Sequence, residues 1–166
     1  VPRFWIPSDN ARLRERRDRV PYETWARQGY LEMTPGNVVD YERIRATING
    51  LRSVFDIREI AVDRWNATHL ATLLEQDGFE LVAFGQGFKD MTAPAKELEK
   101  LILSGKLRHS GHPVLHWMAS NVAAEIDAAG NVKPSKKRST ERIDGIVAAV
   151  MALGRLMVDK GEERSV

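Results

Sequence analysis

The sequence contains no cysteine among its 166 residues. Disulfide bonds and thiolate metal sites are therefore excluded, so carboxylate oxygens or imidazole nitrogens must hold any metal ion. The chain also lacks an apolar run near the roughly 20 residues that a membrane-spanning helix needs. Its first residues, VPRFWIPSDN, do not have the layout of a signal peptide. These absences predict a soluble, globular protein and fit a reducing compartment.

The chain also has little net charge, with a formal value of +2. The basic residues are nevertheless concentrated in two segments. They are Arg12, Arg14, Arg16, Arg17 and Arg19 in the first segment, and Lys133, Lys136, Lys137, Arg138 and Arg142 in the second. Each segment could bind the phosphates of a polyanion such as DNA. The alternative is a solvated helix face and a solvated loop.

The spacing of apolar and turn residues predicts an α/β protein with one core, for which 43% hydrophobic residues suffice. Strand-like stretches alternate with amphipathic helical stretches, and a β-hairpin precedes the last helix. The predicted strands are 1–7, 30–34, 59–63 and 79–84, and the hairpin spans 122–134. This alternation favours a sheet covered by helices.

The last helix places an aspartate beside a buried stripe. Ser139 or Thr140 is predicted to cap this helix. The stripe recurs at three- and four-residue spacing and comprises Ile143, Ile146, Val147, Val150, Met151 and Met157. Asp144 borders the stripe in the first turn, where the helix dipole stabilises an anion by roughly 0.3–1 kcal/mol. Asp144 therefore either supports the helix start or is a functional carboxylate.

A second aspartate, Asp63, ends the strand EIAVD, where open α/β sheets gather functional groups. Its alternative role is to cap the following turn. Asp63 and Asp144 could bind Mg²⁺ or Mn²⁺ for phosphodiester hydrolysis by two metal ions. The basic residues nearby in sequence are Lys136, Lys137 and Arg142. Two carboxylates are too few for such a site, so Asp127 and Asp40 are candidates for a third ligand.

Histidines and tryptophans offer weaker candidates. His109, His112 and His116 have metal-like spacing, but Gly111 and Pro113 interrupt any helix that would present them together. Ordinary surface or packing roles are favoured for these histidines. The tryptophans are expected to anchor the core more than to stack on bases, and they are Trp5, Trp25, Trp65 and Trp117.

Five segments resemble the C-terminal nuclease domain of the terminase large subunit of tailed bacteriophages and prophages. They are VPRFWIP, RDRVPYETWARQGYLEMTPGNVVDY, EIAVDRWNA, GQGFKDMTAPAKELEKLILSGKLRHSGHPVLHWMASN and KKRSTERIDGIVAAVMALGR. Their order and the long central block cover nearly the whole chain. The resemblance is therefore more specific than any isolated aspartate.

The resemblance implies an RNase H-like (retroviral-integrase-like) mixed sheet flanked by helices. It also implies an Mg²⁺- or Mn²⁺-dependent endonuclease that cuts concatemeric double-stranded viral DNA in the bacterial cytoplasm. The second and third acids of the family's triad fall on Asp63 and Asp144. Lys136, Lys137, Arg138 and Arg142 would then handle phosphate. Partners in the intact protein would be the ATPase domain, the small terminase subunit and the portal, with no membrane.

The family's first acid lies on a strand upstream of VPRFWIP. We therefore expect an N-terminally truncated nuclease domain over residues 1–158, a polar tail over residues 159–166, and no ATPase domain. Without the first strand, the fragment is expected to be a weak nuclease or inactive. The alternative function is a non-catalytic module that docks on DNA or on the portal.

Overall fold

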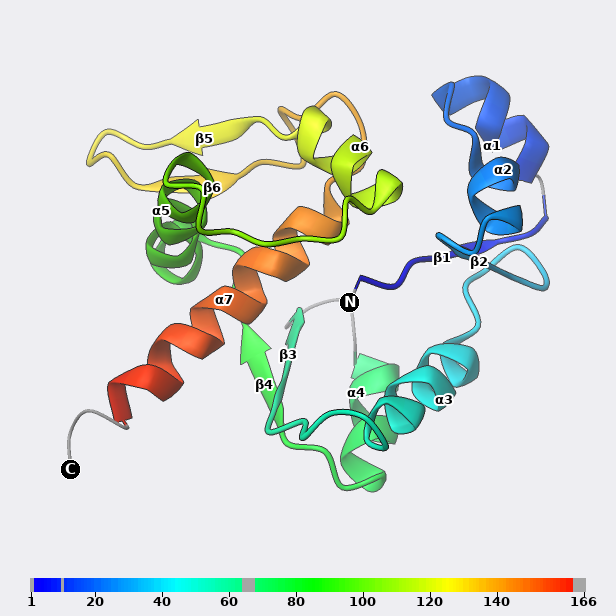
Figure 1. The fold of residues 1–166 in the computed structure, drawn as a ribbon, viewed down its shortest axis with the longest axis horizontal. Coiled ribbons are helices and arrows are strands. Elements are labelled where there is room, and N and C mark those ends of the chain that lie inside the picture. The colour runs from blue at the N-terminus through cyan, green and yellow to red at the C-terminus, as the bar shows by residue number, and fades with distance from the viewer. Residues whose placement is uncertain (1, 10, 64–67, 163–166) are drawn as a thin grey trace.

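The computed structural model describes residues 2–9, 11–63 and 68–162 of the chain. Helices and strands alternate along it, as the sequence predicts (Figure 1). The elements are β1 (Trp5–Pro7), α1 (Ala11–Asp18), α2 (Tyr22–Arg27), β2 (Glu32–Thr34), α3 (Tyr41–Leu51), β3 (Ile60–Asp63), α4 (Thr68–Gln76), β4 (Leu81–Phe84), α5 (Phe88–Leu103), α6 (Pro113–Asn121), β5 (Ala124–Ile126), β6 (Val132–Pro134) and α7 (Asp144–Glu162). No described helix is both long enough and apolar enough to cross a membrane.

The strands form three separate pairs, and this differs from the expected single mixed sheet. β1 pairs with β2 and β3 with β4, both in parallel, whereas β5 and β6 form the predicted antiparallel hairpin. Within the described ranges, no strand lies between the β1–β2 and β3–β4 pairs to supply the hydrogen bonds that would join them. Each parallel pair packs on helices instead, through Ile6 and Met33 in the first pair and Ala61 and Phe84 in the second.

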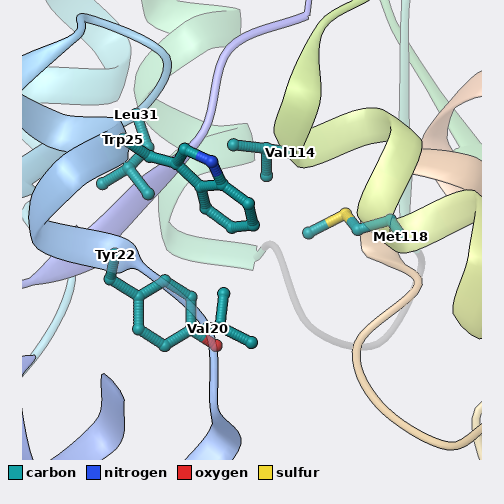
Figure 2. Packing of buried hydrophobic residues seen from close by; sticks show 6 residues of the cluster. All are labelled: Val20, Tyr22, Trp25, Leu31, Val114 and Met118. Atoms are coloured by element: carbon teal, nitrogen blue, oxygen red, sulfur yellow. The ribbon is translucent and has the colours of Figure 1, made fainter.

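One apolar cluster attaches the N-terminal elements to α6. Figure 2 shows side chains from the α1–β2 region facing those of α6, and the buried members are Val20, Tyr22, Trp25, Leu31, Val114 and Met118. The rings of Trp25 and Trp117 extend this contact, with centroids 5.8 Å apart. The expected core role is therefore confirmed for Trp25, while Trp65 lies outside the described residues.

A second cluster packs α7 onto β4 and α5. Its buried members are Phe84, Met91, Ile143, Val147, Val150 and Met151. Most of the predicted stripe of α7 is thus in the core. Ile146 packs against the first cluster instead, and Met157 is exposed. Because α7 contributes to both clusters, its position depends on α6 as well as on β4 and α5.

A glycine allows close approach at each half of α7. A Cβ atom at Gly154 would lie 2.8 Å from Cζ of Phe84, and one at Gly145 would lie 3.0 Å from Sδ of Met118. These separations are too short for ordinary side-chain contact, so the glycines let α7 pack closely on β4 and on α6.

α7 also extends to Glu162, so the first four residues of the expected polar tail are helical.

Candidate functional site

Asp144 is the first residue of α7, directly after the buried Ile143. Its side chain is 54% exposed, and Lys136 Nζ lies 2.7 Å from Asp144 Oδ1. The carboxylate therefore faces solvent and a flexible cation at the positive end of the helix dipole. A group in this position can accept a metal ion or face a phosphate without a large desolvation cost.

The predicted N-cap of α7 is wrong, since the helix starts after Ser139 and Thr140. The Ser139 hydroxyl donates to the carbonyl of Ser135 at 2.7 Å and accepts from the amide of Ala123 at 3.0 Å. The Asn121 side-chain amide donates to the carbonyl of Arg142 at 3.2 Å. These bonds hold the loop before α7 against the end of α6 and against Ala123, which precedes β5, and thereby help to place Lys136 beside Asp144.

Asp63 occupies the predicted place at the carboxyl end of β3. It is half-buried and lies opposite Phe84 in the β3–β4 register. Phe84 belongs to the apolar cluster that packs on α7, so the strand partner of Asp63 is a residue of the core. The backbone at Asp63 is therefore fixed by the ladder, as a preorganised ligand requires.

β3 and α7 run in opposite directions past each other. Glu59, just before β3, accepts two hydrogen bonds from the Arg155 guanidinium, at 2.6 and 2.9 Å. From this pair, Asp63 lies towards the C-terminal end of β3, whereas Asp144 lies towards the N-terminal end of α7. The carboxyl end of β3 and the N-terminal end of α7 accordingly point the same way (Figure 1). Both candidate ligands thus lie at the same end of this pair of elements.

A concavity of about 410 Å³ surrounds Asp144 and joins the two basic segments. It does not include Asp63. Its walls come from the end of α1 and from the loop before α7, and they comprise Arg17, Asp18, Lys136, Ser139, Thr140, Glu141, Arg142, Ile143 and Asp144. Sequence reasoning treated the basic segments separately, because no local signal shows that residues more than a hundred positions apart meet.

Asp18 is the acid on the α1 side of this concavity, and its negative charge is already paired with a positive charge. Arg17 Nε lies 2.6 Å from Asp18 Oδ1, and the Tyr22 hydroxyl donates to Asp18 at 3.1 Å. The Arg17 hydrogen bond holds the pKa of Asp18 below its usual value. Burial, followed by the bond to Asp18, raises the pKa of Tyr22 to about 12. Asp18 therefore anchors the end of α1, and Asp144 is the more accessible acid.

The two candidates for a third acidic ligand have structural roles. The Asp40 carboxylate caps α3 by accepting from the amides of Glu42 and Arg43. Asp127 accepts from Asn131 Nδ2 at 2.8 Å and from the amides of Asn131 and Ala129 at 2.9 Å. The Asn131 side chain contributes most to lowering the pKa of Asp127. Neither carboxylate lines the concavity at Asp144.

Histidine metal binding is not supported by the structure. His112 directly precedes α6 without a side-chain cap bond, and its ring packs against those of Phe4 and Tyr30, with centroid separations of 5.2 and 5.3 Å. Across residues 2–9, 11–63 and 68–162, no group of three or more His, Cys, Asp or Glu side chains is arranged to hold a metal ion. His112 therefore has the predicted packing role.

Comparisons with known proteins agree on one family. Residues 4–160 match the family model of the terminase large subunit, endonuclease domain. The terminase large subunit of Enterobacteria phage HK97 is 43% identical over 155 residues, covering 92% of this chain and 31% of the relative. Protein YmfN of Escherichia coli strain K12 is 33% identical over 169 residues, covering 98% of this chain and 37% of the relative.

A solved structure gives the same result. The crystal structure of the HK97 bacteriophage large terminase matches with a TM-score of 0.84 and 42% identity, covering 91% of this chain and 32% of that chain. The chain therefore spans about a third of the length of these relatives.

Proposed function

Because the chain belongs to the family of terminase large subunit endonuclease domains, we propose that it is a metal-dependent DNA endonuclease. Its substrate would be concatemeric viral DNA, cut in the bacterial cytoplasm as a genome is packaged. The observation that carries this proposal is the family match over residues 4–160, which includes an exposed carboxylate, Asp144, beside basic side chains.

Asp63 and Asp144 are the proposed ligands of Mg²⁺ or Mn²⁺. Both present carboxylate oxygens, which these hard cations prefer, and both lie at the same end of the β3–α7 pair. Two such ions held there would supply an activated water from one ion and stabilisation of the leaving oxygen of the phosphodiester from the other. The exposed Asp144 fits such a role because it can exchange its ion pair with Lys136 for a metal ion without losing a buried hydrogen bond.

Four basic side chains are proposed to hold the DNA phosphates. They are Lys136, Lys137, Arg138 and Arg142, from the loop before α7. Lys136 is already within 2.7 Å of the Asp144 carboxylate, so its ammonium can also approach a phosphate positioned there. We assign Lys136 or Lys137 to stabilising negative charge on the scissile phosphate in the transition state.

We propose that the complete catalytic domain has an RNase H-like sheet. The parallel pairs β1–β2 and β3–β4 would be parts of that sheet, joined by strands from a preceding segment. The same segment would provide the first acid of the triad, on its first strand, to join Asp63 and Asp144. Supporting this view, relatives are about three times as long as the chain. The fragment alone is then expected to cleave DNA weakly or not at all.

Cleavage of supercoiled plasmid tests the proposal. This chain is compared with a chimera that carries the segment preceding the matched region of the HK97 relative, in Mn²⁺, Mg²⁺ or EDTA. We expect the chimera to cut with either metal, EDTA to stop it, and Asp63→Asn or Asp144→Asn to abolish cutting while DNA binding remains. Cutting that persists in either variant would overturn the assignment of that aspartate.

The basic segments also favour a second candidate, a non-catalytic module that docks on DNA or on the portal of the packaging motor. Such a module needs the cations around the concavity but no metal ligand. If both proteins fold and bind DNA but neither cuts, this candidate is favoured. Other partners in the packaging motor would be the ATPase domain and the small terminase subunit.

A further inference from the structure

We propose that α1 is a second DNA-binding element, which faces the loop before α7 across the concavity and holds the DNA backbone beside Asp144. This inference rests on the proposed function, since it takes duplex DNA as the ligand. It adds Arg14, Arg16 and Arg19 to the phosphate-binding residues of the loop. The sequence alone left these arginines open between a polyanion-binding surface and a solvated helix face.

The first observation that supports DNA binding by α1 is the concentration of positive charge in two segments of the chain. Residues 11–19 contain five basic and two acidic residues, and residues 133–144 contain the same numbers. The two segments therefore have an excess of six positive charges, although the whole chain has a net charge of +2. The remainder of the chain is net negative and repels a polyanion, so the joined basic segments are the electrostatically favoured contact.

The second supporting observation is that both segments line one concavity. Arg17 and Asp18 at the end of α1 line the same concavity as Lys136, Arg142 and Asp144. The positive charge of Arg142 also helps to lower the pKa of Asp18, after the larger effects of Arg17 and Tyr22. A DNA strand that reaches Asp144 would pass Arg17 on one side and Lys136 and Arg142 on the other, with the remaining arginines of residues 11–19 on the same segment as Arg17.

Three arginines of the α1 segment are available for phosphate. In the described part of the chain, no carboxylate lies within ion-pair distance of Arg14, Arg16 or Arg19, whereas Arg12 pairs with Glu23 and Arg17 with Asp18. Arg16 and Arg19 are exposed and Arg14 is half-buried. Guanidinium groups suit this role because their planar donors match phosphate oxygens in pairs.

α1 is held in place before any DNA arrives. Glu15 accepts from the amide of Glu23 at 2.9 Å, and Arg12 bonds Glu23 at the same distance. Val20 and Tyr22, which follow the helix, are 2% and 5% exposed and pack towards α6 (Figure 2). The arginines therefore sit on a fixed element, so less conformational entropy is lost on binding than for a flexible basic arm.

The test measures affinity for a short duplex DNA in EDTA, so that no cleavage occurs. The variant Arg14→Gln, Arg16→Gln, Arg19→Gln is compared with the unaltered chain over a series of salt concentrations. The matched control is Lys89→Gln, Lys106→Gln, Arg108→Gln, which removes the same charge at exposed positions outside the concavity. Unfolding midpoints verify folding, and single Arg16→Gln replaces the triple variant if that variant does not fold.

We expect the α1 variant to lose at least tenfold in affinity. Its slope of log affinity against log salt should also become shallower by about two to three, because each phosphate contact contributes about 0.9. The control should lose much less in both measures. Equal losses in the two variants, no loss in the α1 variant, or no duplex binding by the unaltered chain would each overturn the inference. Failure of the Asp144→Asn cleavage test would instead overturn the proposed catalytic function, since this binding assay does not depend on cutting.

Discussion

Glu59 and Arg155 join the start of β3 to α7 through two hydrogen bonds, with side chains 24% and 28% exposed. The pair borders a concavity of about 710 Å³ between these elements. It lies at the opposite end of β3 from Asp63 and far along α7 from Asp144. The ion pair is therefore a structural brace for the two elements that carry the proposed ligands.

Neutralising one partner of this brace should destabilise the protein. We expect Arg155→Gln to lower the free energy of unfolding by about 1–3 kcal/mol, because a half-buried carboxylate loses charged hydrogen bonds. Denaturant unfolding measures the change. The exchanged pair Glu59→Arg with Arg155→Glu should recover part of the loss, and a double variant as unstable as the sum of its single changes would contradict a specific pairing.

Gly154→Ala tests the close packing of α7 on β4. The added methyl group meets the Phe84 ring at under 3 Å, so overpacking of about 1–3 kcal/mol exceeds the gain of up to about 1 kcal/mol in helix propensity. We expect a lower midpoint of thermal unfolding. The matched control is Gly50→Ala in α3, where a Cβ has open space and the same propensity gain should raise the midpoint. Similar shifts in both variants would show that packing does not decide the outcome.

Asp77 predicts a loss of stability in acid. It accepts from Arg45 at 2.5 and 2.7 Å and from Asn49 at 2.6 Å, and the bonds from Arg45 contribute most to lowering its pKa to about 2. As pH falls below about 4, the unfolded chain takes up the proton first. The Asp77 contribution to stability is therefore present above pH 4 and is lost as pH falls through about 2.

Unfolding of the unaltered chain and of Asp77→Asn at several pH values between 5 and 2 measures this effect, because the lowered pKa of Asp77, about 2, sets this window. The variant should be less stable near neutral pH and should have a weaker pH dependence. Asp56→Asn, an exposed carboxylate outside this network, should keep the pH dependence of the unaltered chain. An unchanged slope in Asp77→Asn would refute the assignment.

His112 predicts a second pH effect, closer to neutrality. Burial between Phe4 and Tyr30 lowers the pKa of His112, Arg3 adds a smaller decrease, and the Tyr30 backbone opposes them. The unfolded chain therefore binds a proton near the ordinary value of about 6.5, before the folded chain does. Stability is full above this value and falls as pH decreases towards the lowered pKa.

Denaturant unfolding between about pH 7.5 and 5 checks the His112 prediction. His112→Gln should remove most of the decrease in stability across this range. His109→Gln is the control, because His109 is exposed and lies outside the packed rings. If the slope survives in His112→Gln and disappears in His109→Gln, the titrating group has been misidentified.

Local chemistry predicted many of the elements. The hairpin predicted over residues 122–134 is present as β5 and β6, and bonds between Asp127 and Asn131, only four residues apart, hold its turn. The start of α7 could not be predicted in this way. The Ser139 hydroxyl, a plausible cap in sequence, is used by Ala123 and Ser135 instead, and the first of these bonds spans 16 residues.

The sequence predicted where the two candidate aspartates lie in the secondary structure, but not which side chains surround them. Asp63 and Asp144 stand at a strand end and a helix start, as inferred from their positions in the sequence. The approach of Arg17 to Arg142 depends on the packing of α2 against α6, including the contact of Trp25 with Trp117. Periodicity reports which face of a helix is apolar, but it does not identify the partner of that face.

The Glu59–Arg155 ion pair holds α7 at a point far from Asp144, so a tilt of the helix about this pair displaces Asp144. Arg155 and Asp144 are 11 positions apart, which corresponds to about 16 Å of helix at about 1.5 Å per residue. A tilt of about 2° about the Glu59–Arg155 pair would move Asp144 by about 0.5 Å, the tolerance of a preorganised ligand set. A small tilt of α7 thus produces a larger displacement at its N-terminal end. The position of the Asp144 carboxylate therefore depends on contacts made three turns away.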